Sequence, residues 1–287
     1  MPTTRLAAAR VPTAILPAMS DPSLSGKAEP SGRAATPTEG ERAAPGLPEI
    51  DVNEYGGKKE GVKQAMNRRL FMQLLVFDVP LEANADETAT RLAARLREGG
   101  IAAVVYADAM DPRGIGLLTW SESPDFFVDK LRPFLRHSAF HNLAFKPDYT
   151  MVGRTYSIGY EPNLEEWLLH RPRKVVTDSE WKWHVWYPLR RKGSFNSLPA
   201  DEQMTILREH GKIGHGFGDA GLAHDIRLAC FGIDQFDNDF VIGLIGKELY
   251  PLSACVQAMR KTQQTSNHME HMGPFFVGKA VWQKIAG

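Results

Sequence analysis

The sequence has little cysteine, no excess of charge of either sign and no long apolar run. Two cysteines in 287 residues cannot form a disulfide framework or a four-thiolate zinc site. Lysine plus arginine number 34, as do aspartate plus glutamate, and a net charge of zero argues against binding nucleic acid through bulk charge. No apolar run approaches the roughly 20 residues that cross a bilayer. The sequence therefore predicts a soluble cytoplasmic protein without a nucleic-acid or membrane partner.

Aromatic residues are absent from the first 50 residues, which hold 8 of the 19 prolines. Such a segment cannot bury enough apolar surface to offset its ordering entropy, so we predict a disordered tail over residues 1–65. Residues 1–20 contain two arginines and no acid, as targeting peptides do. Their apolar stretch is short and broken by Pro12 and Pro17, which favours a solvated tail.

The rest of the chain alternates strand and helix patterns in two similar halves. In the first half we expect strands at 70–79, 101–109, 114–120 and 149–157, and helices at 87–98 and 124–136. In the second half we expect strands at 181–187, 226–232, 239–245 and 275–282, and helices at 198–210 and 252–262, the first of these ending at Gly211.

Two short matches indicate an internal duplication. GIGLL at 114–118 aligns with VIGLI at 241–245, and MVGR at 151–154 aligns with FVGK at 276–279, at nearly the same offset. Each half therefore follows the order strand–helix–strand–strand–helix–strand, which is the ferredoxin-like pattern. The two apolar sheets are expected to pack against each other.

Histidine offers the most specific chemistry. His210 is expected in the last turn of its helix, where it could stabilise the helix C-terminus or serve as an axial ligand to a heme-type iron. His268 and His271 are spaced i, i+3, but no acidic or thiol partner completes a zinc site, so we expect polar residues on a turn.

Two basic clusters follow aromatic or apolar segments. One cluster, Arg190 to Lys192, begins three residues after Tyr187, and the other lies in HRPRK at 170–174. Arginine binds carboxylates through two parallel hydrogen bonds, so such clusters suit a ligand with several carboxylates. A solvated basic turn is the alternative.

Over about residues 69–287, the chain resembles the chlorite dismutase family. The resemblance is carried by the segments YPLRRKG, REHG, FGIDQFDNDFVIGL, AMRKTQQTS and GPFFVGK. It implies an α+β fold in which two fused ferredoxin-like domains form a dimeric α+β barrel, assembled as a homopentamer. The expected domains are residues 66–175 and a heme-binding domain at 176–287.

Within that family, the coproheme decarboxylases convert coproheme III to heme b by two peroxide-dependent oxidative decarboxylations. Their Tyr-Pro-Met-x-Lys segment, whose tyrosine forms the radical that attacks the propionate, resembles residues 187–191 here. The resemblance implies that Tyr187 is catalytic and that the porphyrin contacts Tyr187, Pro188, Leu189, Arg190 and Arg191. Leu189 stands where the family has methionine, and Arg191 where it has lysine.

The resemblance implies further site residues. His210 in REHG matches the proximal histidine and is expected to ligate the iron, with His215 as a nearby competitor. Substrate carboxylates are expected to meet Arg173, Arg260 and Ser266, with Thr265 beside the last.

Over the iron, the family's distal glutamine or arginine falls at Asp225. His224 and Arg227 are its neighbours, and of these His224 is taken as a cofactor contact. His170 is the candidate catalytic base, because some decarboxylases place a distal histidine well upstream of the tyrosine.

We therefore expect a peroxide-dependent coproheme decarboxylase, with Fe-coproporphyrin III as substrate and redox centre and heme b as product. The alternatives are a chlorite-decomposing or peroxidase-type heme enzyme, or a non-enzymatic member of the same fold.

Overall fold

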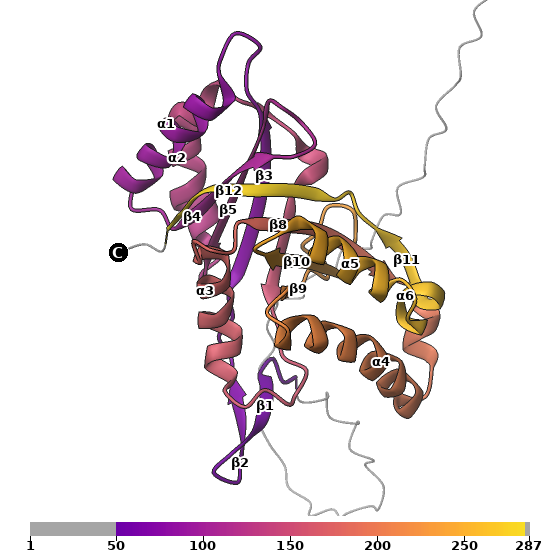
Figure 1. Ribbon diagram of the computed structural model, residues 1–287. Coiled ribbons are helices and arrows are strands. Elements are labelled where there is room, and N and C mark those ends of the chain that lie inside the picture. Colours follow the sequence, from indigo (N-terminus) through magenta and orange to yellow (C-terminus); the bar gives the residue numbers. More distant parts are fainter. Residues whose placement is uncertain (1–49, 285–287) are drawn as a thin grey trace, which may run out of the picture. The chain divides into compact units, whose positions relative to one another are not determined.

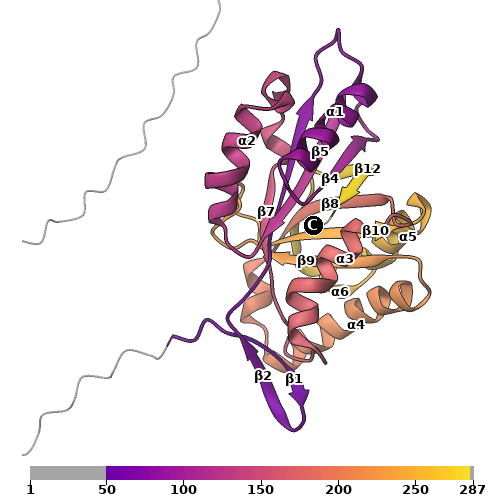
Figure 2. The same ribbon diagram turned by 90° about the vertical axis from the view of Figure 1, so that its left-hand side faces the viewer.

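A closed barrel of eight antiparallel strands forms the centre of the computed structural model, which describes residues 50–284. The barrel closes because β8 pairs with β12 on one edge and with β10 on the other. Around it the order is β10, β9, β7, β3, β5, β4, β12 and β8. Figure 1 labels these strands except β7, which Figure 2 labels. Their bounds are β3 Phe71–Asp78, β4 Ala103–Asp108, β5 Gly114–Ser121, β7 Met151–Thr155, β8 Trp183–Arg191, β9 His224–Ala229, β10 Phe240–Gly246 and β12 Phe276–Lys284.

Each half of the barrel has the ferredoxin-like strand order. The first half runs β7, β3, β5, β4, and the second runs β9, β10, β8, β12, so the outer strands of one half pair with those of the other at β4–β12 and β7–β9. This confirms the predicted fold of two fused ferredoxin-like domains. Gly116 and Gly243, aligned by the sequence match, lie on the third strand of their respective halves, β5 and β10.

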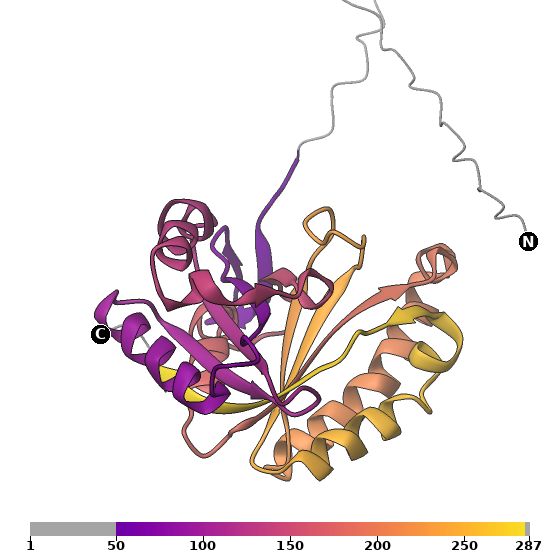
Figure 3. The ribbon, with the colours of Figure 1, turned by 90° about the horizontal axis from the view of Figure 1, so that it is seen from above.

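Helices cover the outside of each half. The first half carries α1 (Ala85–Glu98), a π-helical segment η1 (Phe126–Leu131) and α2 (Arg132–Arg136). The second half carries α4 (Ala200–Asp219), α5 (Leu249–Met259) and α6 (Gln263–His268), as Figures 2 and 3 show from two further directions. None of the helices among residues 50–284 is long and apolar enough to cross a membrane.

Shorter elements connect these layers. A π-helical turn, η4 (Glu166–His170), leads into α3 (Arg171–Thr177) between the two halves, and β11 (Met269–Met272) adds to β8. Elsewhere lie β6 (Ala144–Phe145) and the 3-10 turns η2 (Ala139–Asn142), η3 (Pro147–Tyr149) and η5 (Gly193–Ser197).

The predicted disordered tail is wrong in its last part. Residues within it form a hairpin of β1 (Glu54–Lys59) and β2 (Val62–Met66), held to the body by Glu54, which accepts from Arg154 and Ser157. These polar contacts, together with Met66, which packs against the core, connect the hairpin to the rest of the protein. The remainder of the predicted tail, residues 1–49, lies outside the described residues.

Alternation along every barrel strand creates three apolar clusters. One strand face points into the barrel, where Leu74, Tyr106, Trp186 and Phe276 belong to a single cluster. The other face of the first half packs against α1 and η1, and that of the second half packs against α5. The third cluster includes Tyr187 and Leu189, two of the predicted site residues.

Helix α4 is longer than the sequence predicted. Gly211 was expected to end it, but α4 continues to Asp219 through four glycines. His210 therefore lies within the helix rather than in its last turn. Each of these glycines costs roughly 1 kcal/mol relative to alanine in the interior of a helix.

A hydrogen-bonded chain crosses the barrel interior. The buried His184 ring contacts the Trp181 carbonyl through Nε2 (3.0 Å) and the Tyr106 hydroxyl through Nδ1 (2.7 Å). Because a carbonyl only accepts, Nε2 carries the proton and Nδ1 accepts from Tyr106. The Trp186 indole N–H donates to the Tyr106 oxygen at 3.4 Å. Burial lowers the pKa of His184 to about 4.

We expect acid to destabilise the apoprotein through His184. Between pH 6.5 and about 4 the unfolded chain binds a proton that buried His184 does not, so the free energy of unfolding rises with pH across this window. The loss on acidification is about 3 kcal/mol. Urea unfolding across this pH range measures it, and His184→Leu should be less stable but have a pH slope shallower by about one proton. Equal slopes would contradict this assignment.

Candidate functional site

Alternate residues of β8 face the layer between the sheet and helices α4 and α5. Tyr187 and Leu189 belong to the cluster on this face, and Arg191 follows at the same spacing. Pro188 lies on the opposite face, and the Arg190 guanidinium is paired with Asp237 and Glu270. Strand geometry thus separates the five predicted contacts, and only three of them face α4 and α5.

Tyr187 occupies the middle of this face. The register places Ile242 of β10 beside Tyr187, and Arg227 of β9 beside Ile242. The Tyr187 ring stacks on Phe275, with centroids 4.6 Å apart. Burial raises the pKa of the Tyr187 hydroxyl well above its ordinary value, with Cys255 contributing in the same direction. The phenol therefore keeps its proton at neutral pH.

Helix α4 faces this sheet surface but packs on it sparsely. Of its 20 residues only Ile206 is buried, whereas the 14-residue α1 buries five residues against the first half. A Cβ built at Gly214 would meet only Met259, at 3.4 Å, and one at Gly211 would meet nothing within 4 Å. Helix α4 therefore contributes few buried side chains to the layer beside His210.

His210 projects from α4 toward the basic residues of the sheet. Its pKa falls to about 4, first because of burial and then because of the positive charges of Arg191 and Arg227. Its Nδ1 lies 3.1 Å from the hydroxyl of Thr262. Among the described residues no hydrogen bond engages Nε2, so this nitrogen is available as a ligand.

Arg191 is a half-buried cation without an acidic partner. Its guanidinium lies 4.8 Å from the ring centroids of both Phe195 and Phe240, and no carboxylate of residues 50–284 pairs with it. The Asp239 carboxylate accepts from the backbone N–H of Arg191 instead. Burial lowers the pKa of this guanidinium, and its Nε has no hydrogen-bond partner in the described part of the chain. A carboxylate ligand would satisfy both the charge and the donor.

Another cation lies beside an open groove at the C-terminal end of α5. The groove has a volume of about 290 Å³ and is lined by Arg260, Thr265, Met269 and Met272, among others. The predicted Ser266 is not among the lining residues, and its hydroxyl donates to the carbonyl of Thr262, the residue before α6. Thr265 presents the hydroxyl that the sequence assigned to Ser266.

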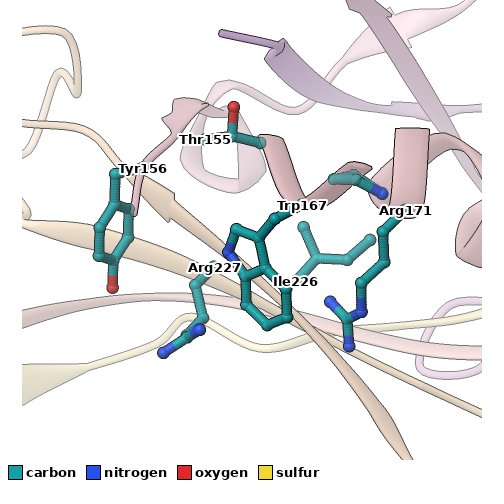
Figure 4. A pocket seen from close by; sticks show the side chains of 7 residues that line it. Thr155, Tyr156, Trp167, Arg171, Ile226 and Arg227 are labelled. Atoms are coloured by element: carbon teal, nitrogen blue, oxygen red, sulfur yellow. The ribbon is translucent and has the colours of Figure 1, made fainter. Parts of the chain in front are cut away.

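A stacked arrangement joins β9 to the helical segment before β8. The Trp167 ring lies between the guanidinium groups of Arg171 and Arg227, at 4.6 and 5.2 Å (Figure 4). The Asp225 carboxylate pairs with both arginines, at 3.2 Å each. Asp225, the position of the distal residue by sequence, is therefore engaged in neutralising two cations.

Three predicted site residues lie apart from Tyr187 and His210. His170 is exposed at the start of α3. Arg173 pairs with Glu122, just beyond the end of β5. His224 stacks on Trp181 with ring centroids 4.2 Å apart, and strand alternation puts it on the opposite face of β9 from Asp225 and Arg227. The structure does not place these three with the other candidates.

Some residues of the site were missed or undervalued from the sequence. Thr262 contacts His210 across 52 positions, which no local pattern reveals. The sequence identified Arg227 only as a neighbour of Asp225, although alternation along β9 places it on the face of Tyr187. Phe275 stands next to the aligned FVGK motif, and its stacking depends on how β12 meets β8.

Together the fold and site define a dimeric α+β barrel protein in which helix α4, with His210, covers the second half of the barrel. The family model for chlorite dismutase matches residues 87–281, and the chain belongs to the chlorite dismutase family. A heme-binding protein from Thermus thermophilus is similar in structure, with 22% identity, a TM-score of 0.57 and coverage of 75% of this chain and 92% of that one. The chlorite dismutase of Candidatus Nitrospira defluvii in complex with imidazole is also similar, with 12% identity, a TM-score of 0.58 and coverage of 76% of this chain and 93% of that one.

The residues of the site fit the iron of a porphyrin better than a metal ion held by protein side chains alone. Among residues 50–284 no group of three or more histidine, cysteine or acidic side chains could hold a metal. A single imidazole with a free Nε2 can provide an axial bond, since the macrocycle itself supplies the other ligands. The unpaired Arg191 and the sparsely packed α4 suit a flat ligand that carries carboxylates.

Proposed function

We propose that this protein binds coproheme III and removes two of its carboxyl groups in a peroxide-dependent reaction that yields heme b. The observation that carries this proposal is the convergence of three groups in one layer: His210 with a free Nε2, the protonated phenol of Tyr187, and Arg191 with no acidic partner. The heme named for the Thermus thermophilus neighbour and the family membership support a porphyrin ligand.

Each residue has a distinct role in this proposal. His210 binds the iron through Nε2, Arg191 holds a propionate, and Arg260 with Thr265 holds a second carboxylate at the groove. When bound, the iron porphyrin supplies the oxidising chemistry with peroxide. Tyr187 would give up its hydroxyl hydrogen atom to the oxidant derived from peroxide, and the resulting tyrosyl would take a hydrogen atom from the propionate Cβ and become a phenol again. The Cβ radical would give a second electron to the same oxidant as the carboxylate leaves as carbon dioxide. Stacking on Phe275 holds the ring in place.

The overall reaction is balanced by one peroxide for each carboxyl group. A propionate, hydrogen peroxide and one proton give a vinyl group, carbon dioxide and two waters, so the substrate loses two electrons in each round. Two rounds convert coproheme III to heme b.

Adding coproheme III and hydrogen peroxide to the purified protein tests the proposal. We expect mass spectrometry to show the loss of two carboxyl groups, and His210→Ala to lose the Soret band of the bound porphyrin along with turnover. Coproheme that is recovered unchanged from the wild-type reaction would contradict the proposed activity. A Soret band that persists unaltered in His210→Ala would assign the ligand elsewhere.

Arg227 favours a second candidate, the decomposition of chlorite. This arginine shares the sheet face of Tyr187, and its charge acts on His210. Its guanidinium is paired with Asp225, which offsets the charge that would bind an oxyanion. Oxygen release on adding chlorite to the heme-loaded protein distinguishes this activity from decarboxylation.

A further inference from the structure

The hydrogen bonds around Thr262 determine how His210 is presented. The Thr262 hydroxyl lies 2.7 Å from the carbonyl of Met259 and 3.1 Å from Nδ1 of His210. A hydroxyl has one proton, and the carbonyl can only accept, so that proton goes to Met259. The hydroxyl oxygen must then accept from His210, which requires the proton of the ring to be on Nδ1.

Thr262 is itself held firmly. It is buried, and its carbonyl accepts from both the backbone N–H and the hydroxyl of Ser266, each at 2.9 Å. The next residue, Gln263, donates its backbone N–H to the carboxylate of Glu209, which adjoins His210 on α4. Helices α4 and α6 are thus joined at the histidine, and the acceptor for Nδ1 has little freedom to move.

We propose that Thr262 is a positioning residue, which keeps His210 in the Nδ1–H tautomer and directs the lone pair of Nε2 into the layer between α4 and the sheet. This inference rests on the proposed role of His210 as iron ligand. Outer partners of this kind orient a metal-binding imidazole and set its basicity, and their loss typically weakens metal affinity by about 10- to 100-fold. A hydroxyl is a neutral acceptor, so it orients the ring but polarises the Nδ1–H bond of His210 less than a carboxylate would.

The tautomer can be measured without any porphyrin. In the apoprotein labelled with nitrogen-15 histidine, we expect the ring nitrogens of His210 to report a proton on Nδ1 in wild type and in Thr262→Ser. In Thr262→Val, which keeps the shape and loses the hydroxyl, the signals should move toward the Nε2–H form. His210→Ala assigns the resonances. Thr205→Val is the control, because the Thr205 hydroxyl donates to a carbonyl of α4 and does not contact His210. This variant should leave the ring signals of His210 unchanged.

The porphyrin-bound protein supplies a second readout. In the ferrous state, Thr262→Val should lower the iron–histidine stretching frequency and weaken heme affinity by about tenfold, and Thr262→Ser should restore both. Thermal unfolding of each variant separates misfolding from a local effect. If wild type shows a His210-dependent band and Thr262→Val leaves the tautomer and the frequency unchanged, the role of Thr262 is overturned while the proposed function stands. If wild type binds no porphyrin, the proposed function fails, and the tautomer still decides the inference.

Discussion

Replacing Tyr187 with phenylalanine is expected to reduce decarboxylation of coproheme at least about a thousandfold, which corresponds to about 4 kcal/mol in the activation barrier. Phenylalanine preserves the ring, its burial and the stack on Phe275. It lacks the O–H group that gives up a hydrogen atom. Because burial keeps the pKa of this hydroxyl high, electron and proton must leave together, and no other phenol occupies this position on β8.

Binding should be unaffected by this change. His210 and Arg191 remain in place, so the porphyrin affinity of Tyr187→Phe should match that of wild type. Tyr250→Phe is a matched control, since Tyr250 is 80% exposed on α5. Single-turnover mass spectrometry measures the carboxyl groups lost, and electron paramagnetic resonance tests for a tyrosyl signal that is absent from Tyr187→Phe. Full turnover by Tyr187→Phe would refute the assigned role.

Much of the fold could be predicted because the barrel obeys local rules. Strands such as 71–78 alternate between two buried faces, and α1 has a clear stripe of Leu92 and Leu96. The course of α4 could not be predicted. Its glycines are typical of a helix end, and only tertiary contacts, such as the bond between His210 and Thr262, explain why the helix continues.

The parts of the candidate site that lie on a single strand could be predicted from the sequence. The parts that depend on how several elements pack together could not. Tyr187 and Arg191 are two steps of alternation apart, so their shared face follows from the sequence. The same rule would have placed His224 and Asp225 on opposite faces of β9. The positions of His170 and Arg173 depend on how η4 and α3 pack between the halves, and Arg173 pairs there with Glu122, which follows β5 of the first half. No motif in the sequence specifies that contact.

Steric crowding explains why the sequence repeat has glycine at both 116 and 243. The same crowding predicts a large loss of stability when Gly243 is replaced. A Cβ at Gly243 would lie 2.5 Å from the Trp186 ring, and one at Gly116 would lie 2.5 Å from the Phe276 ring. Both rings are fully buried inside the barrel, and β10 is paired on both edges, so neither side can yield. Each half therefore has a glycine where a large ring fills the space of a side chain, and this ring comes from the adjacent β8 at Gly243 and from β12, two strands away, at Gly116.

Gly243→Val should therefore destabilise the protein by about 3 kcal/mol or more, since overpacking a closed core forces side chains off their rotamers. Gly216→Ala is the matched control: a Cβ there meets nothing within 4 Å, and alanine should stabilise the interior of α4 by about 0.5–1 kcal/mol. Urea unfolding followed by tryptophan fluorescence measures both changes. An unfolding midpoint for Gly243→Val equal to that of wild type would show that Trp186 can move aside, and the steric explanation of the repeat would then be wrong.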